Sequence, residues 1–209
     1  MMEIISALNW RYAVREFSEQ TIESATIDKL AEATRLSASS YGLQPYRLII
    51  LRDTATRQQL LQHAYGQTKV RDSSHLFILA IQTQINEAFI DNHFNMVENQ
   101  RGLQAGALAG FSNHVKEAML PMSQLELSQW AENQAHIALG NLLTVAAIEQ
   151  VDACPMAGFN KAGFDHVLGL KHKGLSSSVI CALGVRSSSD ASAKYVKTRV
   201  PQNQFCIRL

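Results

Sequence analysis

The chain has 209 residues, of which 46% are hydrophobic and 18% charged, and its formal net charge is +1. This length and composition suit one large domain with a substantial core. The near-zero net charge excludes a global field that would attract nucleic acid or an anionic membrane, and no apolar run reaches the roughly 18 residues that a membrane span needs.

The N-terminal region predicts two amphipathic helices. Ile4, Ile5 and Leu8 share one face of a short first helix. Thr26 can cap a second helix, whose apolar residues recur at helical spacing as far as residues 35–37.

Two strands are predicted in the next part of the chain. The polar loop "SASSYGLQP" precedes the first, "YRLIIL" at 46–51, and the second is the apolar run "HLFILAIQ" at 75–82. A helix is predicted between them, at 54–65.

The C-terminal half predicts one long helix and two further strands. Residues 86–120 are helical but less regular, and Ser123 with Glu126 makes a capping box that opens a helix reaching Ile148. A strand is predicted at 179–186 between clusters of serine. The tail "QNQFCIRL" could form another strand.

Strands separated by helices favour one layered α/β domain over residues 1–209. The tail is harder to place, because Phe205, Ile207 and Leu209 alternate as in a half-buried strand yet lie far from the preceding strand. It could complete the sheet of a partner chain or lie on its own sheet.

Common catalytic motifs are missing from the sequence. There is no phosphate-binding P-loop, no GxGxxG, no GxSxG and no HExxH. The three cysteines are far apart and predict no zinc site, and the N-terminus lacks the pattern of a signal peptide. We therefore expect a cytoplasmic protein without a metal, nucleic-acid or membrane partner, and an enzyme of this kind would take its chemistry from a cofactor.

The stretch "NWRYAVREF" at 9–17 places Arg11 and Arg15 four residues apart after the first helix. Taken alone, two arginines are more often solvated surface charges. Their planar guanidinium groups also match the geometry of phosphate and carboxylate oxygens. The other segments of the chain decide whether the pair lies in solvent or binds an anion.

Five segments in order resemble the FMN-dependent nitroreductase family. The stretch "RYAVREF" resembles the family's "R-R-S-x-R-x-F". The others are "SASSYGLQPYRLIIL", "AYGQTKVRDSSHLFIL", "CPMAGF", interpreted as a loop after the long helix, and "KTRVP" near the C-terminus.

This resemblance implies an α+β sandwich of the nitroreductase-like fold, with a mainly antiparallel central sheet flanked by helices. It also implies an intertwined homodimer in which a C-terminal arm, 197–209, exchanges a strand with the partner. Residues 90–125 would be a helical excursion over the active site.

The resemblance further implies a set of residues that bind FMN. Arg11, Lys197 and Arg199 would hold the phosphate, while Arg15 and Lys69 would lie near the pyrimidine edge of the ring and tune it. The remaining cofactor-binding residues would be Tyr12, Ala13, Ser39, Ser40, Tyr41, Gly42, Leu43, Gln44, Gln67, Pro155, Met156, Ala157 and Gly158, with 39–44 coming from the second subunit.

The implied activity is hydride transfer from NAD(P)H through flavin N5 to a nitroaromatic, quinone or related small-molecule acceptor, in a ping-pong mechanism. A specialised flavin enzyme, such as an enal reductase or a dehalogenase, and a non-catalytic flavin-binding or redox-sensing protein are the alternatives. Ala13, Gly42 and Ala157 depart from the family pattern, and Ala157 leaves the preferred reductant open.

Overall fold

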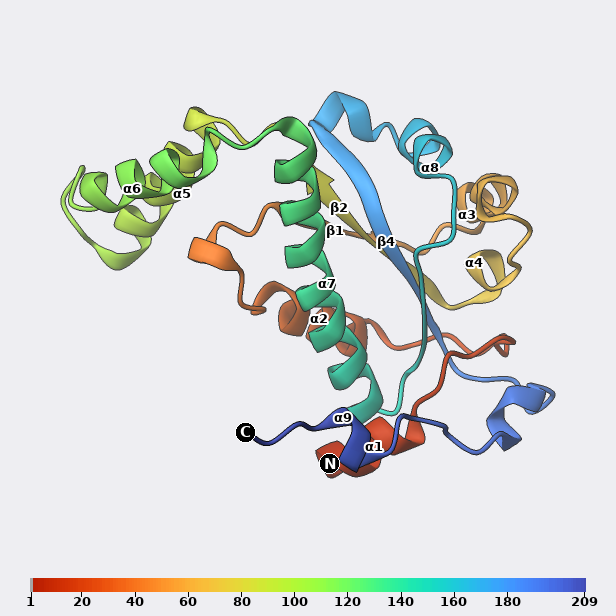
Figure 1. Cartoon of the computed structure of the whole chain (residues 1–209). Coiled ribbons are helices and arrows are strands. Elements are labelled where there is room, and N and C mark those ends of the chain that lie inside the picture. Colours follow the sequence, from red (N-terminus) through yellow and green to blue (C-terminus); the bar gives the residue numbers. More distant parts are fainter. Residues whose placement is uncertain (1) are drawn as a thin grey trace.

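A four-stranded antiparallel sheet forms the centre of the chain in the computed structural model, which describes residues 2–209 (Figure 1). The strands are β1 (Tyr46–Leu51), β2 (His75–Gln82), β3 (Asp152–Met156) and β4 (Leu175–Gly184), in the order β1-β2-β4-β3. Each neighbouring pair is antiparallel. The two central strands, β2 and β4, are buried almost throughout, because helices cover both faces of the sheet.

Successive residues of β2 enter two different hydrophobic clusters. Phe77 and Leu79 pack with the helices on one face, whereas Leu76 and Ile78 pack with those on the other, as the two-residue period of a strand requires. The first face carries α2 (Ser24–Arg35) and α7 (Gln124–Ile148), with α1 (Ile4–Trp10) packed on α7. The second face carries α3 (Thr54–Leu61), α4 (Lys69–Asp72) and α8 (Lys161–Val167). The predicted layered α+β sandwich is confirmed.

The N-terminus of α7 is closed by the predicted capping box. The Glu126 backbone N–H donates to Ser123 Oγ at 3.3 Å, and the Ser123 N–H donates to Glu126 Oε2 at 2.7 Å. For α2, in contrast, the prediction of Thr26 as the cap is wrong. The helix begins one turn earlier, because the Glu23 carbonyl already accepts the N–H groups of Thr26 and Ile27.

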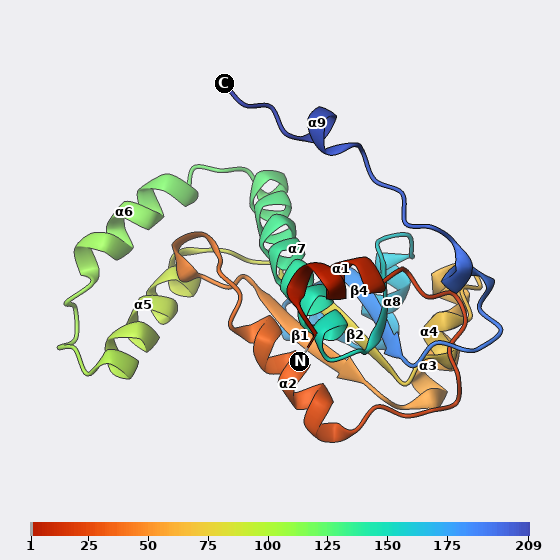
Figure 2. The ribbon, with the colours of Figure 1, turned by 90° about the horizontal axis from the view of Figure 1, so that it is seen from below.

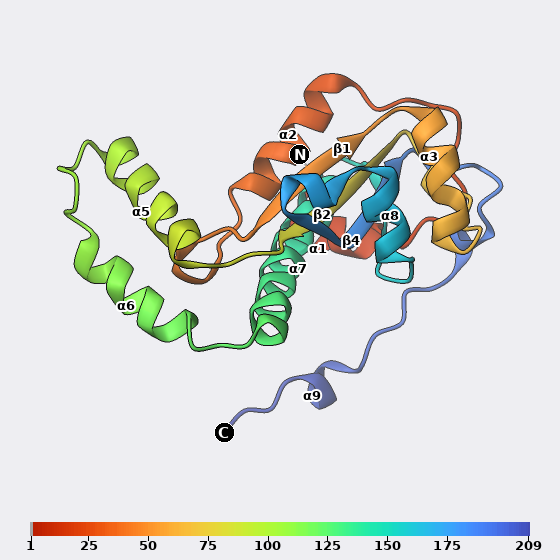
Figure 3. The same ribbon diagram turned by 90° about the horizontal axis from the view of Figure 1, so that it is seen from above.

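Residues 87–119 form two helices that project from the body of the molecule (Figure 3). They are α5 (Glu87–Arg101) and α6 (Ala109–Met119). The buried Glu98 carboxylate accepts the N–H groups of Gly106 and Leu108 at 2.9 and 2.7 Å, which fixes the turn between them. The predicted helical character of 86–120 is confirmed, with a break at 102–108. Short 3-10 helices lie at Ser40–Gly42, Gln62–Ala64, Leu170–Lys173 and Ala191–Lys194.

Two strand predictions need correction. The interpretation of "CPMAGF" as a loop is wrong for its first three residues, which end β3. Pro155 is tolerated there because β3 is an edge strand of the sheet. The serines that were expected to precede the third strand lie inside β4. Ser177, for example, is buried and its N–H donates to Asp165 Oδ1 at 2.7 Å.

The C-terminal tail does not form a strand within this chain. It contains the short helix α9 (Gln202–Phe205) and runs away from the body of the molecule (Figure 2). Phe205 and Ile207 are 78% and 83% exposed, since no edge of the chain's own sheet lies beside them. The alternation of Phe205, Ile207 and Leu209 therefore has no sheet to pack on in a single chain.

Candidate functional site

The segment that follows α1 is held along the edge and end of the sheet. Ala13 forms a parallel bridge with Ala153 in β3, and Phe17 forms an antiparallel bridge with Arg186 just beyond β4. The Ser18 N–H donates to the Val185 carbonyl at 2.8 Å. Residues 13–18 are thus fixed by backbone pairing, and with them Arg15.

A cavity of about 490 Å³ lies beside this segment. Its lining combines residues from both ends of the chain, namely Asn9, Trp10, Arg11, Tyr12, Ala13, Arg15, Pro155, Arg186, Ser192, Ala193, Tyr195, Val196, Lys197 and Arg199. Seven of the predicted site residues meet here, including both arginines of the motif and the cations of "KTRVP".

Four of the lining residues, Arg11, Arg15, Lys197 and Arg199, form a cationic cluster. Within residues 2–209 none of the four makes an ion pair with a carboxylate, and the buried Nε of Arg11 has no hydrogen-bond partner. Burial lowers the pKa of Arg11, and the nearby Arg199 lowers it further. A group of cations that lacks a counter-charge and keeps one donor unsatisfied is suited to binding an oxyanion such as a phosphate.

Lys197 joins the two ends of the chain at this cavity. Its Nζ donates to the Leu8 carbonyl at 2.5 Å and to the Arg11 carbonyl. These are carbonyls at the C-terminal end of α1, which a lysine commonly satisfies. Burial lowers the pKa of Lys197, as do the charges of Arg11 and Arg199. The lysine therefore ties residue 197 to its own chain, whatever the tail beyond it does.

Asp190 lies near the cationic cluster, but its carboxylate is already engaged. It is 3% exposed and accepts the N–H groups of Arg15 and Ser192, each at 2.9 Å, and the Tyr12 hydroxyl at 3.1 Å. Burial alone would raise its pKa, but the hydrogen bonds from the Arg15, Ser192 and Glu16 N–H groups hold that pKa below 3.8. The acid therefore organises the backbone of the site and pairs with none of its arginines.

A second group of predicted residues adjoins the cavity through Pro155. Gln67 Nε2 donates to the Gly158 carbonyl at 2.8 Å, and this bond fixes the turn that follows β3. The Lys69 ammonium lies next to the Cys154 thiol, whose pKa is raised by burial and drawn back by Lys69. The side chain of Met156 belongs to the core, whereas Ala157 and Gly158 are exposed.

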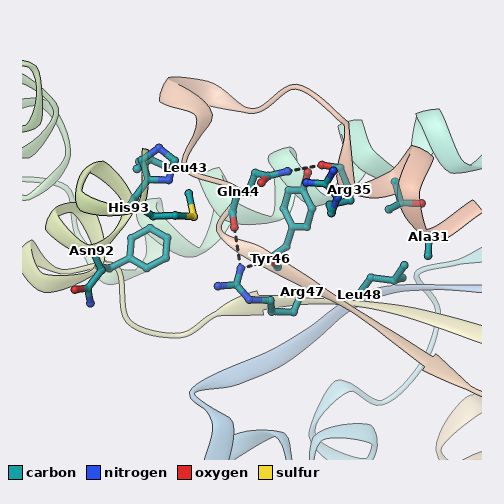
Figure 4. A pocket seen from close by; sticks show the side chains of 12 residues that line it. Ala31, Arg35, Leu43, Gln44, Tyr46, Arg47, Leu48, Asn92 and His93 are labelled. Carbon is teal, nitrogen blue, oxygen red and sulfur yellow. Dashed lines mark hydrogen bonds between the residues drawn. The ribbon is translucent and has the colours of Figure 1, made fainter. Parts of the chain in front are cut away.

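The predicted residues Ser39–Gln44 do not line this cavity. The Ser40 N–H donates to Gln134 Oε1 in α7 at 2.8 Å, and the Leu43 side chain is in the core. Leu43 and Gln44 instead line a different cavity, of about 470 Å³, between α2, β1 and α5. Figure 4 shows Gln44 there, hydrogen-bonded to Arg35 and Arg47. One chain alone does not bring segment 39–44 to the cationic cluster.

Sequence reasoning missed several residues that build the cavity. Trp10, Arg186 and Asp190 were not singled out, although each contacts the segment that carries Arg11 and Arg15. Arg186 was placed at the end of a strand, but nothing local indicates that it stacks on residues more than 170 positions away. The serine-rich stretch before Asp190 indicated only a turn.

Residues 2–209 lack two features that would point to other functions. No helix in this range has the length and apolar character to cross a membrane. No three His, Cys, Asp or Glu side chains in it are grouped so as to hold a metal ion.

The chain is similar, in both sequence and structure, to proteins whose family is known. A Bacillus subtilis protein provisionally named NAD(P)H nitroreductase YfkO is 30% identical over 199 residues, which cover 88% of this chain and 89% of that protein. A crystal structure of a provisionally assigned nitroreductase, YdfN of Bacillus subtilis, has a TM-score of 0.86 at 19% identity and covers 98% of both chains.

A provisionally assigned nitroreductase from Exiguobacterium sibiricum, solved in complex with FMN, has a TM-score of 0.83 at 16% identity and covers 100% of this chain and 98% of its own. These structural likenesses show the same fold. The model of the Nitroreductase family matches residues 8–185, and the chain therefore belongs to that family.

Proposed function

We propose that the chain is an FMN-dependent oxidoreductase that uses NAD(P)H as its reductant. The observation that carries this proposal is the cationic cluster, whose four charges lack an acidic partner in residues 2–209 and surround a cavity next to the predicted ring-binding residues. A phosphate dianion needs several charged donors, and Arg11, Lys197 and Arg199 supply them from both ends of the chain. The family membership and the FMN complex of the Exiguobacterium relative support the same cofactor.

When bound, FMN would take two electrons from NAD(P)H and pass them to a nitroaromatic, quinone or related acceptor in a ping-pong sequence. The protein's own residues would bind and tune it. Arg15 and Lys69 would face the edge of the ring that gains negative charge, and the exposed turn at 157–158 would bring backbone close to the ring.

The test of this function is spectroscopic. The purified protein, or the protein after addition of FMN, should be yellow, and its absorbance should bleach under anaerobic conditions with NADH or NADPH. A nitroaromatic or a quinone should then restore the colour. A protein that refuses FMN, or holds FMN that neither reductant bleaches, would contradict the proposal.

Replacing Arg15 by glutamine should lower the two-electron potential of the bound flavin. A charged hydrogen bond contributes about 1.5–3 kcal/mol, which corresponds to about 30–60 mV for a two-electron couple. FMN affinity should change little, because the phosphate cations remain. Spectroelectrochemical titration measures the potential, and an unchanged value would remove Arg15 from the edge of the ring.

We also propose that the protein is a homodimer and that segment 39–44 of each subunit completes the site of the other. Ile4, Ile5 and Leu8 are 49%, 59% and 38% exposed on α1, and Phe205 and Ile207 in the tail are 78% and 83% exposed. Exposed apolar surface of this extent is typical of a subunit interface. No residue of α5 or α6 lines the 490 Å³ cavity of its own chain, so in such a dimer the excursion 90–125 would cover the partner's site.

Deleting residues 202–209 should destabilise this dimer and weaken FMN binding. Phe205, Ile207 and Leu209 would lose the partner surface that covers them, and the anchoring of the neighbouring Arg199 would loosen. Size-exclusion chromatography with light scattering gives the mass, and FMN titration gives the affinity. A truncated protein that stays dimeric and binds FMN with unchanged affinity would show that the arm is dispensable.

A further inference from the structure

The guanidinium of Arg186, two residues beyond β4, lies between two aromatic rings. Its central carbon is 4.3 Å from the centroid of the Trp10 ring and 4.6 Å from that of the Tyr12 ring. A planar guanidinium can stack on aromatic faces on both of its sides, which the compact lysine ammonium cannot do. Both rings belong to residues that flank Arg11.

The edge of the same guanidinium is bound to Asp152, the first residue of β3. Arg186 Nε donates to Asp152 Oδ1 at 2.8 Å, the closest approach of guanidinium and carboxylate is 2.5 Å, and the Arg186 backbone N–H donates to Oδ2 at 2.7 Å. Asp152 is 4% exposed and is paired with Gly184 of β4 in the sheet. Arg186 therefore connects the rigid ends of β3 and β4 to residues 10–12.

This connection has a consequence for the direction of Arg11. Residue 11 has φ −71° and ψ 144°, close to polyproline II, so its side chain leaves the backbone in a different direction from those of Trp10 and Tyr12. When Trp10 and Tyr12 both hold the Arg186 guanidinium, the side chain of Arg11 is directed by them. Tyr12 is held a second time, through its hydroxyl bond to Asp190 at 3.1 Å.

We propose that Arg186 is a positioning residue of the cofactor site. By stacking between Trp10 and Tyr12 while bound to Asp152, it holds Arg11 in the orientation in which it receives the phosphate. The inference rests on the proposed function, because it takes the phosphate of FMN as the group that Arg11 binds.

The experiment compares FMN affinity in variants of the full-length apoprotein, titrated by flavin fluorescence. Arg186→Lys keeps the charge opposite Asp152 but loses the planar faces, and should raise the Kd for FMN about fivefold. The double variant Arg186→Met with Asp152→Asn removes both charges together, and should raise it at least about tenfold. Arg52→Lys, at an exposed arginine between β1 and α3 that does not line the cavity, is the matched control and should leave the Kd unchanged.

A second measurement reports on the segment itself. The chain has two tryptophans, so in a Trp130→Phe background the fluorescence comes from Trp10 alone. Acrylamide quenching of Trp10 should increase in Arg186→Lys and stay constant in Arg52→Lys. A mere loss of global stability would not change quenching under conditions in which all variants are folded.

The outcomes separate this inference from the proposed function. If the wild-type protein binds FMN and both Arg186 variants bind it within twofold of that affinity, with unchanged Trp10 quenching, the positioning role is wrong and the proposed function stands. If the wild-type protein binds no FMN, both are wrong. If the double variant does not fold, the FMN affinity and Trp10 quenching of Arg186→Lys, which keeps the positive charge opposite Asp152, test the positioning role.

Discussion

Replacing Arg11 by alanine should weaken FMN binding by roughly tenfold to a hundredfold. One charge-assisted hydrogen bond contributes about 1.5–3 kcal/mol, and each 1.4 kcal/mol is a factor of ten in Kd. Arg11 is the member of the cationic cluster whose buried Nε has no partner in residues 2–209, so this donor remains free to bind a ligand. Fluorescence titration of the apoprotein measures the effect.

The same substitution should leave the unliganded protein at least as stable as the wild type. Burial and the neighbouring Arg199 both lower the pKa of Arg11, which means that the folded apoprotein bears a cost for keeping this charge. Urea unfolding without FMN or phosphate should therefore give an equal or slightly higher free energy of unfolding for Arg11→Ala. A lower value, together with unchanged FMN affinity, would assign Arg11 to the fold and contradict its role in binding.

Inorganic phosphate tests the cationic cluster without the rest of the flavin. It should raise the melting temperature of the wild-type apoprotein, because a ligand that binds only the folded state stabilises it. The increase should shrink in Arg11→Ala and in Arg199→Ala, and should be retained in Arg52→Ala, whose exposed arginine lies between β1 and α3 and does not line the cavity. Equal stabilisation in all four proteins would mean that phosphate binds elsewhere.

Local pattern was sufficient to predict the elements that are long or strongly apolar. The continuous apolar run of β2 and the capping box of α7 each carry their signal within a few residues. The strand β3 escaped prediction because it has only five residues and contains a proline, so its pairing with β4 is decided by the rest of the sheet. Tertiary context dominates for such short strands.

The residues of the candidate site also differ in whether local sequence predicts them. The four residues of the cationic cluster could be predicted, because arginine and lysine at the matching positions define the resemblance. The residues that orient them could not. Tyr12 and Asp190 are 178 positions apart, and Arg186 and Asp152 are 34 apart, so each becomes meaningful only once the sheet brings them together. The segment 39–44 lies away from the cavity in one chain, and its role in the site stays a prediction that depends on the dimer.

Asp190→Asn should destabilise the protein by about 2–3 kcal/mol at pH 7 and loosen the site at the same time. The carboxylate accepts the N–H groups of Arg15, Glu16 and Ser192 as well as the Tyr12 hydroxyl. An asparagine turns an NH₂ group toward some of these donors, and a buried donor left without an acceptor costs about 1–3 kcal/mol. Urea unfolding measures the loss, with Asp28→Asn on the exposed side of α2 as the control.

The destabilisation should depend on pH with a defined sign. The pKa of Asp190 in the folded protein is below 3.8, its ordinary value, so the folded state binds fewer protons at this group than the unfolded state near that pH. The stabilising contribution of Asp190 is therefore fully present above pH 3.8 and is lost as the pH falls through the folded-state pKa. The difference in unfolding free energy between the wild type and Asp190→Asn should stay constant from pH 7 to about pH 5 and narrow below about pH 4. A difference that widens on acidification would show that the carboxylate is not the acceptor of these four hydrogen bonds.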